Sequence, residues 1–182
     1  MDNIFDTAVS EYNVDKYLDF LAKAEGDPDY NTIVGGGKFS DYSKHPGVVG
    51  VTTKEGPSTA AGRWQITKTT YDDVAPKVGV TDFSPDSQKK IAIKLLEDNN
   101  ALEDVQKGDW DAANAKLGKV WASLPSSPYK QPKKSQEWVK ETLKATMDAD
   151  NAAHKADTAQ PLQVLDRPGS VDMWFYIYFT RK

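Results

Sequence analysis

The chain has no cysteine among its 182 residues, and this absence narrows the structures and chemistries that it can use. It excludes disulfide bonds, thiolate nucleophiles, cysteine zinc ligands and iron–sulfur clusters. The fold must therefore rest on a hydrophobic core, which a chain of this length can bury. The two histidines, His45 and His154, lie far apart in the sequence, so we expect no metal site, no Ser-His-Asp triad and no cofactor. Carboxylate side chains are therefore the candidates for acid–base catalysis.

The charge balance limits the partners of the chain. It carries 27 acidic and 23 basic side chains, a formal net charge of -4, which argues against nucleic-acid binding through a basic face. No apolar run reaches the roughly 18 residues of a membrane-spanning helix. The first residues also lack the basic start and apolar core of a secretory signal. We therefore expect no transmembrane segment, and export would need another route.

Two kinds of secondary structure follow each other in the first half of the chain. Apolar residues from Val14 to Ala24 recur at helical spacing, and Gly26 and Pro28 predict the end of that helix. From Asp27 to about Arg63 the sequence becomes glycine-rich and predicts a small irregular sheet or hairpin region. Helical patterns return after it, with expected starts at Ser84-Pro85, Asp109 and Ser135, the last continuing to about Asp150.

The C-terminal part differs in composition. Residues 151–160 are polar and alanine-rich, and residues 173–179 hold five of the 19 aromatic side chains. That run suits a β-strand but is too short to span a bilayer. Residues 161–182 could form an extra strand packed on the domain, a docking segment for another protein or a membrane-surface contact. We favour packing, because an exposed strand of this kind promotes aggregation.

Glu25 is the carboxylate with the most distinctive position. It lies eleven residues after Val14, on the same helical face as the apolar stripe and just before Gly26. Partial burial, the negative end of the helix dipole and an excess of acids in residues 1–30 all favour its protonated form. The position predicts the raised pKa that a general acid needs. Spacing alone, however, favours a helix-end residue that faces water.

A resemblance to a known family favours the general acid over the water-facing helix end as the interpretation of Glu25. Seven segments occur in a specific order: Ala24-Glu25-Gly26, Tyr30 to Gly36, Phe39 to Ser43, His45-Pro46, Ser58 to Ile66, Asp82 to Pro85 and Trp121 to Pro125. Each is weak alone, but the ordered set closely resembles the phage-lambda-type lysozymes, endolysins that cut bacterial peptidoglycan. The resemblance covers roughly residues 14–131, about two thirds of the chain.

The resemblance implies an α+β, lysozyme-like fold, in which a mainly helical lobe and a small β lobe enclose a saccharide cleft. It implies that residues 1–150 form the catalytic domain and that residues 151–182 are a tail outside it. The family's catalytic acid lies in the Glu-Gly pair that ends the first long helix, which here is Glu25. Family members are lytic transglycosylases, which break the MurNAc-β-1,4-GlcNAc bond without water and leave a 1,6-anhydromuramic product.

Two other activities stay open at this point. Asp41 lies in the β region, where a hydrolytic lysozyme keeps its second carboxylate, so a hydrolytic muramidase is possible. A turn residue that bonds to its own backbone is the simpler interpretation of Asp41. A catalytically silent virion module that only binds peptidoglycan is the other alternative.

Four more residues are candidates for substrate binding. Gln65 and Arg63 lie in a segment that resembles the family's cleft wall, and Tyr129 matches a cleft tyrosine, although its Pro128-Tyr129-Lys130 context departs from the family's Gly-Tyr-Gly. Tyr42 could stack on a sugar ring, but tyrosines in β segments more often serve packing. The partner implied is the peptidoglycan glycan strand, and we expect a monomer.

Lysines cluster before and within the last predicted helix: Lys130, Lys133, Lys134, Lys140 and Lys144. A solvated helix face with ion pairs to Glu137 and Glu141 is the simpler interpretation, and approach to the anionic cell wall is the alternative. The family implies a protein that waits in the host cytoplasm and reaches the wall through a holin. A virion-associated enzyme is the alternative location.

Overall fold

A computed structural model describes residues 4–53 and 56–158. The chain divides into two compact units, Met1–Ala149 and Asp150–Lys182, and the boundary falls inside the last helix. The aromatic run at 173–179 and the predictions made for residues 161–182 lie outside the described residues. In the described part, no helix is both long and apolar enough to cross a membrane.

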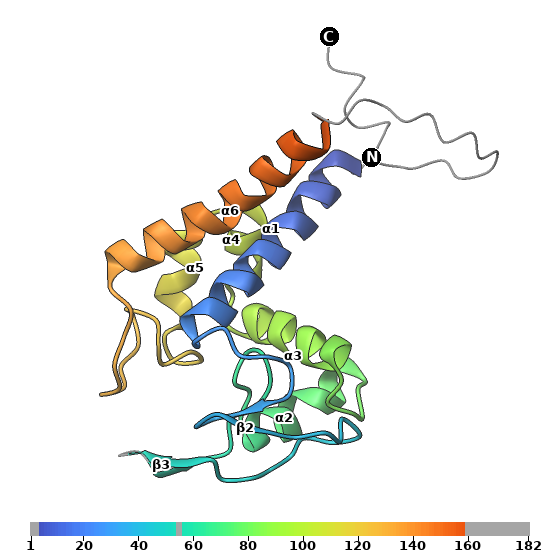
Figure 1. Ribbon diagram of the computed structural model, residues 1–182, viewed down its shortest axis with the longest axis vertical. Coiled ribbons are helices and arrows are strands. Elements are labelled where there is room, and N and C mark those ends of the chain that lie inside the picture. Colours follow the sequence, from blue (N-terminus) through green and yellow to red (C-terminus); the bar gives the residue numbers. More distant parts are fainter. Residues whose placement is uncertain (1–3, 54–55, 159–182) are drawn as a thin grey trace, which may run out of the picture. The chain divides into compact units, whose positions relative to one another are not determined.

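Helix α1 (Ile4–Ala24) is the central element of the first unit (Figure 1). The predicted helix from Val14 to Ala24 is confirmed, but α1 begins ten residues earlier, at Ile4. Its buried residues start at Asn13 and Val14, whereas Val9 and Tyr12 are exposed. Of residues 7–12 none is buried, so hydrophobic periodicity could not reveal that part of the helix.

Helix α1 ends in a Schellman motif. The amide of Gly26 donates to the Lys23 carbonyl at 3.1 Å, and that of Asp27 donates to the Ala22 carbonyl at 2.8 Å. Gly26 has φ of +93°, which a residue with a Cβ adopts only with strain. Glu25 therefore occupies the C-cap, the last position before the chain leaves the helix.

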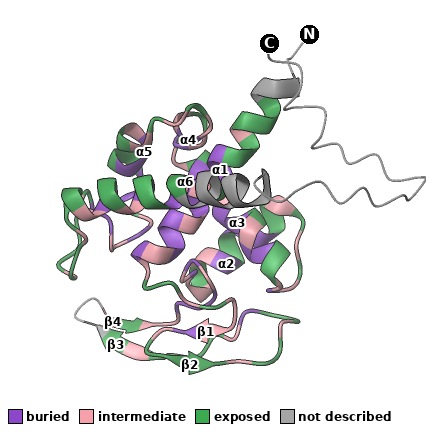
Figure 2. Ribbon diagram, turned by 45° about the horizontal axis from the view of Figure 1, so that its top comes forward, coloured by how far each residue is buried: buried purple, intermediate pink, exposed green. Residues whose placement is uncertain are grey.

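The predicted β region consists of two antiparallel hairpins. Strand β1 (Thr32–Ile33) pairs with β2 (Gly37–Lys38), and β3 (Val51–Thr53) pairs with β4 (Gly56–Ser58). Ala61 bridges to both Ile33 and Ile66, which connects the first hairpin to the turn that follows β4. The hairpins lie together beside the helices, as Figure 2 shows.

Several short helices follow the hairpins. All three predicted starts are confirmed: Ser84 caps α3 by accepting from the Ser87 amide, with Pro85 as first residue, and Asp109 caps α5 by accepting from the Ala112 amide. Ser135 directly precedes α6 and accepts from the Trp138 amide at 3.0 Å. The helices are α2 (Lys68–Val74), a 3-10 turn (Ala75–Val78), α3 (Pro85–Asp98), α4 (Leu102–Lys107), α5 (Trp110–Leu117) and α6 (Gln136–Thr158).

Helix α6 corrects one predicted boundary. It continues to Thr158, past the end expected near Asp150. The added segment, Asn151–Thr158, contains three alanines and a lysine and no glycine or proline, so nothing in it stops a helix. The first turns of α6 pack on α1, where Lys23 Nζ donates to Thr146 Oγ1 at 3.0 Å and the rings of Phe20 and Trp138 lie 6.2 Å apart.

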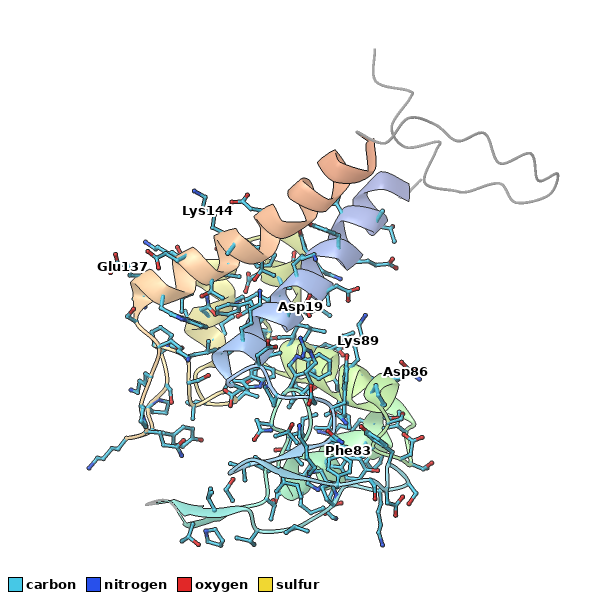
Figure 3. All side chains as sticks on the ribbon, viewed as in Figure 1. Asp19, Phe83, Asp86, Lys89, Glu137 and Lys144 are labelled. Atoms are coloured by element: carbon cyan, nitrogen blue, oxygen red, sulfur yellow. The ribbon has the colours of Figure 1, made fainter. Side chains whose placement is uncertain are left out.

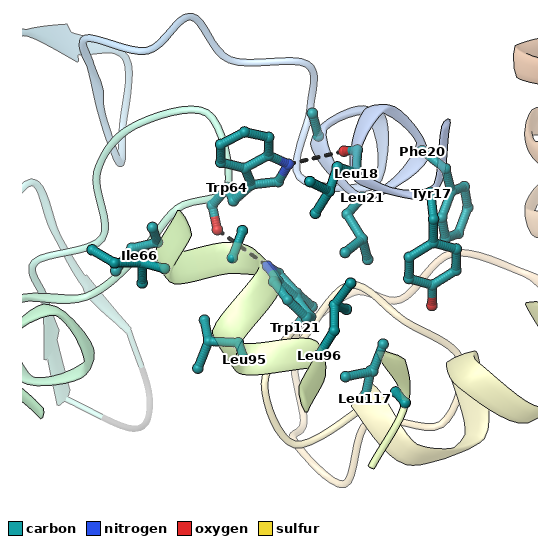
Figure 4. Close-up of a cluster of buried hydrophobic side chains, with 14 of the residues drawn as sticks. Tyr17, Leu18, Phe20, Leu21, Trp64, Ile66, Leu95, Leu96, Leu117 and Trp121 are labelled. Carbon is teal, nitrogen blue, oxygen red and sulfur yellow. Dashed lines mark hydrogen bonds between the residues drawn. The ribbon is translucent and has the colours of Figure 1, made fainter. Parts of the chain in front are cut away.

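Two buried tryptophans join distant parts of the core. The indole of Trp64 donates to the Leu18 carbonyl at 2.9 Å, and the indole of Trp121 donates to the Trp64 carbonyl at 3.1 Å (Figure 4). Trp64 is a core residue, with 3% of its surface exposed. These bonds fix α1, the turn after β4 and the segment after α5 relative to one another.

Candidate active site

Glu25 lies where two cavities meet. The larger, about 590 Å³, is lined by β4, by Gln65 and by Tyr129. The smaller, about 380 Å³, is lined by Ser123 and residues 131–134 among others. Glu25, Ala122 and Gln131 line both cavities, so the two form one cleft with the half-buried carboxyl group of Glu25 near its middle.

The surroundings of Glu25 adjust its protonation. Burial raises the pKa of its carboxyl group, while the hydrogen bond from Ser123 and the charge of Lys134 act in the opposite direction. Ser123 Oγ donates to Glu25 Oε1 at 2.5 Å. The net shift is upward. The sequence suggested acidic neighbours as one cause, yet the neighbouring charge that acts on Glu25 is a lysine, so desolvation alone outweighs the rest.

Gln65 faces the larger cavity from a strained turn. Its φ is +50°, an uncommon value for a residue other than glycine and one found often at functional sites. Its backbone amide and its side-chain Nε2 both donate to the Gly62 carbonyl, at 3.2 and 2.8 Å. The side chain is therefore held in place.

Gln88 supports that turn from behind. Its fully buried amide accepts from the Arg63 amide at 3.0 Å and donates to the carbonyls of Tyr30 and Phe83, both at 2.9 Å. A Cβ added at Gly62 would overlap with the Oε1 atom of Gln88. One buried side chain thus joins three segments, and glycine is required where they meet.

Tyr129 also lines the larger cavity, as its resemblance implied. Its hydroxyl donates to the Lys119 carbonyl at 3.2 Å and its amide donates to Ser127 Oγ at 3.2 Å. The residue is 40% exposed, so its ring can offer a face to a ligand.

Arg63 does not line the cleft. Its guanidinium lies 3.5 Å from an Asp19 oxygen and 3.4 Å from an Asp27 oxygen, donates to the Pro28 carbonyl and covers the ring of Tyr30. These contacts hold the segment that follows Glu25 against α1. Arg63 therefore supports the loop after α1, and it is not among the described residues that line the two cavities.

Asp41 and Tyr42 lie outside both cavities. The Asp41 carboxylate accepts from the Ser43 amide at 2.8 Å, and hydrogen bonds from the side chain and then the amide of Ser43 lower its pKa. This is the turn that the simpler interpretation predicted. The ring of Tyr42 packs against that of Phe39 at 5.1 Å, and its carbonyl accepts from the Phe83 amide. Asp41 was a candidate for a second carboxylate and Tyr42 for stacking on a sugar ring, and neither is among the described residues that line the two cavities.

His45 serves the fold. Its ring is buried, Nδ1 accepts from the Gly47 amide at 3.0 Å and Nε2 donates to the Ile66 carbonyl at 2.8 Å. Burial lowers the pKa of this imidazole. Among the described residues, no three histidine or acidic side chains cluster as metal ligands would.

Sequence reasoning missed Ser123, Lys133 and Lys134. The Trp121 to Pro125 segment was recognised, but no local pattern shows that its serine contacts a residue 98 positions earlier. The lysines were noted for their charge and not for their place beside Glu25.

A half-buried carboxylic acid at the end of a helix, in a cleft bordered by small hairpins, is the arrangement of a lysozyme-like protein. Residues 15–148 match the family model described as Endolysin. The chain belongs to the endolysin family.

Curated relatives agree with this assignment. The endolysin of Escherichia phage lambda is 36% identical over 124 residues, covering 63% of this chain and 78% of the relative. The endolysin of Escherichia phage P2 is 36% identical over 143 residues, covering 69% and 87%.

Solved structures match the fold. The lysozyme of bacteriophage lambda in complex with a chitohexasaccharide superposes with a TM-score of 0.70 at 30% identity, covering 81% of this chain and 97% of that one. A second structure of the lambda lysozyme gives a TM-score of 0.62 at 29% identity, covering 84% and 97%. The predicted α+β, lysozyme-like fold is confirmed.

Proposed function

We propose that this chain degrades bacterial peptidoglycan by cleaving the MurNAc-β-1,4-GlcNAc bond, with Glu25 as general acid and then general base. The observation that carries the proposal is the half-buried Glu25 carboxyl, whose pKa is raised and which lies near the middle of the cleft. The endolysin relatives and the sugar-bound lambda lysozyme support a glycan as the ligand.

Proton transfer can be followed from this position. Protonated Glu25 donates to the glycosidic oxygen, and an oxocarbenium-like state develops on the muramic sugar. Glu25 is then a carboxylate, which the Ser123 hydroxyl stabilises by its hydrogen bond. A raised pKa suits the first role and the hydrogen bond suits the second.

The 6-hydroxyl of muramic acid can complete the reaction. It attacks C1, Glu25 accepts its proton, and the product is a 1,6-anhydro sugar with no water consumed. Usual glycosidases need two carboxylates. Glu25 is the only carboxylic acid among the described residues that line the two cavities, which favours this route over a hydrolytic muramidase.

Gln65 and Tyr129 are our proposed substrate-binding residues. Gln65 is held by its bond to Gly62, and its Oε1 has no hydrogen-bond partner among the described residues, so it is free to accept from a sugar hydroxyl or acetamido group. The exposed ring of Tyr129 offers a stacking face.

The test compares the parent chain with Glu25→Gln on purified peptidoglycan. We expect the parent to reduce turbidity and the variant to bind without cleaving. Mass spectrometry should find products lighter by one water than hydrolytic ones and resistant to borohydride reduction. Products with reducing muramic ends would instead identify a hydrolase. Lysis by Glu25→Gln would show that Glu25 is not the catalytic acid. A parent chain that binds peptidoglycan without lysing it would identify a binding module.

We propose that residues 1–150 carry this activity and that residues 151–182 are an addition to it. The family match at 15–148 supports the division. Deleting residues 161–182 should leave lysis of purified peptidoglycan unchanged. If the deletion lowers the melting temperature, these residues pack on the domain; altered membrane or protein binding would identify a docking segment.

We further propose a monomer that acts at lysis, released through a holin to the cell wall. Membership of the endolysin family supports the lysis stage. Size-exclusion chromatography with light scattering tests the monomer. Detection of the chain in purified virions would favour an enzyme used at entry.

A further inference from the structure

The smaller cavity beside Glu25 carries two lysines. Lys133 and Lys134 line it together with Gln131 and Ser123, and Glu25 is the only acid among its described lining residues. The whole chain has a formal net charge of -4, so this local excess of positive charge is opposite in sign to the net charge of the chain.

Contacts with the protein place both lysines. The Lys134 amide donates to the Ser123 carbonyl at 2.8 Å, and its Nζ lies 4.5 Å from the centre of the Trp138 ring. Lys133 Nζ donates to the Ser127 carbonyl. An ammonium group has three donors, so each lysine keeps capacity for a further acceptor.

Neither lysine is paired with a carboxylate in the described part of the chain. This separates them from the lysines that hold an acid within ion-pair distance: Lys38, Lys68, Lys77, Lys89, Lys94, Lys107 and Lys116. The predicted pairs with Glu137 and Glu141 are not among the ion pairs of the described residues. Glu137 and Lys144 project outward from α6 (Figure 3) and line neither of the two cavities.

We propose that Lys133 and Lys134 form a carboxylate-binding subsite beside Glu25, which takes the anionic side branch of muramic acid. The inference rests on the proposed function and adds to it a preference for charged glycan over neutral glycan. The carboxylate has two sources in peptidoglycan: the lactyl group, when it carries no peptide, and the acidic residues of the attached peptide. A chitin hexamer has neither, so it would occupy the cleft without using the lysines.

The test measures binding in the Glu25→Gln background, so that glycan is not consumed and the effect of Lys134 on Glu25 ionisation is absent. The variants are K133Q/K134Q, its charge-retaining counterpart K133R/K134R, and the matched control K140Q/K144Q on exposed positions of α6. The ligands are peptide-bearing glycan strands, amidase-stripped strands with free lactyl carboxylates, and chitohexaose.

We expect K133Q/K134Q to bind the charged strands about fivefold more weakly at low salt, because exposed charge pairs contribute modestly, and to bind chitohexaose unchanged. High salt should shrink the difference. K133R/K134R and K140Q/K144Q should behave like the background. A loss confined to peptide-bearing strands assigns the peptide carboxylates, and a loss confined to stripped strands assigns the lactyl group.

Equal binding of all three ligands by K133Q/K134Q and its background would overturn the subsite. So would an equal loss for chitohexaose, or an equal loss in K140Q/K144Q. These outcomes are distinct from failure of the proposed function, which would appear as absence of glycan binding in the background chain or as lysis by Glu25→Gln. Thermal melts of each variant separate misfolding from loss of the subsite.

Discussion

The hydroxyl of Ser123 donates to Glu25 across 98 residues of sequence, at 2.5 Å. The same segment carries Trp121, whose indole binds the carbonyl of Trp64, while the indole of Trp64 binds α1 at Leu18. The contact that adjusts the proposed acid is therefore positioned by the core, and changes in core packing reach the cleft through it.

Removing this hydroxyl should move the pH profile of lysis. The bond to Ser123 lowers the pKa of Glu25, so Ser123→Ala raises that pKa further and the acid stays protonated to higher pH. We expect the alkaline limb of the rate profile to shift upward. Ser126→Ala is the control, because Ser126 Oγ donates to the Asn114 carbonyl away from the cleft. An unmoved or downward-shifted limb in Ser123→Ala would contradict the assignment of Glu25 as the acid.

Burial of Glu25 should destabilise the fold at pH values above the pKa that Glu25 has in the unfolded chain. Burial raises its pKa above the ordinary value of 4.5, so the folded chain holds a proton that the unfolded chain has lost, and stability declines as pH rises through that interval. Glu25→Gln mimics the neutral form and can still accept from Ser123. We expect its melting temperature to exceed that of the parent at pH 7 and the two to converge below pH 4.5. A variant less stable at pH 7 would refute this.

Gly62→Ala should destabilise the fold strongly. The added methyl group meets Gln88 Oε1, and φ of +76° is unfavourable for alanine. Gly79 has a similar φ of +67° but open space around it, so Gly79→Ala measures the backbone effect alone. We expect about 1 kcal/mol of destabilisation for Gly79→Ala and about 3 kcal/mol for Gly62→Ala in denaturant unfolding. Equal losses in the free energy of unfolding would show that the Gln88 side chain moves aside without destabilising the fold.

Gln65 and Arg63 should give opposite results although they are two residues apart. Gln65→Ala removes a cleft-facing amide, so we expect about tenfold weaker chitohexaose binding with little change in melting temperature. Arg63→Ala removes contacts to Asp19, Asp27 and Pro28, so we expect a fall of a few degrees in melting temperature with chitohexaose affinity retained. Calorimetric titration and thermal melts distinguish the pair. The reverse pattern would place Arg63 in the cleft.

Local signals accounted for part of this structure. The buried half of α1, the caps at Ser84 and Asp109 and the glycine that ends α1 follow from spacing and residue type. Residues 7–12 of α1 bury no side chain and carry no such pattern. Helix α4 has no side-chain cap and only one buried side chain, Val105, so its sequence gives little to recognise.

The site was predictable only where one local segment determines it. Glu25 could be nominated because its helix end is a local feature. The position of Arg63 behind the cleft depends on Asp19 and Asp27, which belong to α1 and the loop after it. The contact with Ser123 depends on tertiary packing, which a pattern along the chain does not encode.

The Schellman motif that ends α1 also limits where the chain can accept insertions and deletions. Glu25 is fixed both by the last helical turn and by the core residues of the same helix. Inserting or deleting one residue between Leu18 and Glu25 would turn the carboxyl by about 100° around the helix axis and direct it away from Ser123. In the β1–β2 turn, Gly36 lines neither of the cavities that Glu25 borders. Insertions and deletions among active homologues should therefore gather around Gly36 in the β1–β2 hairpin and be absent from this stretch of α1.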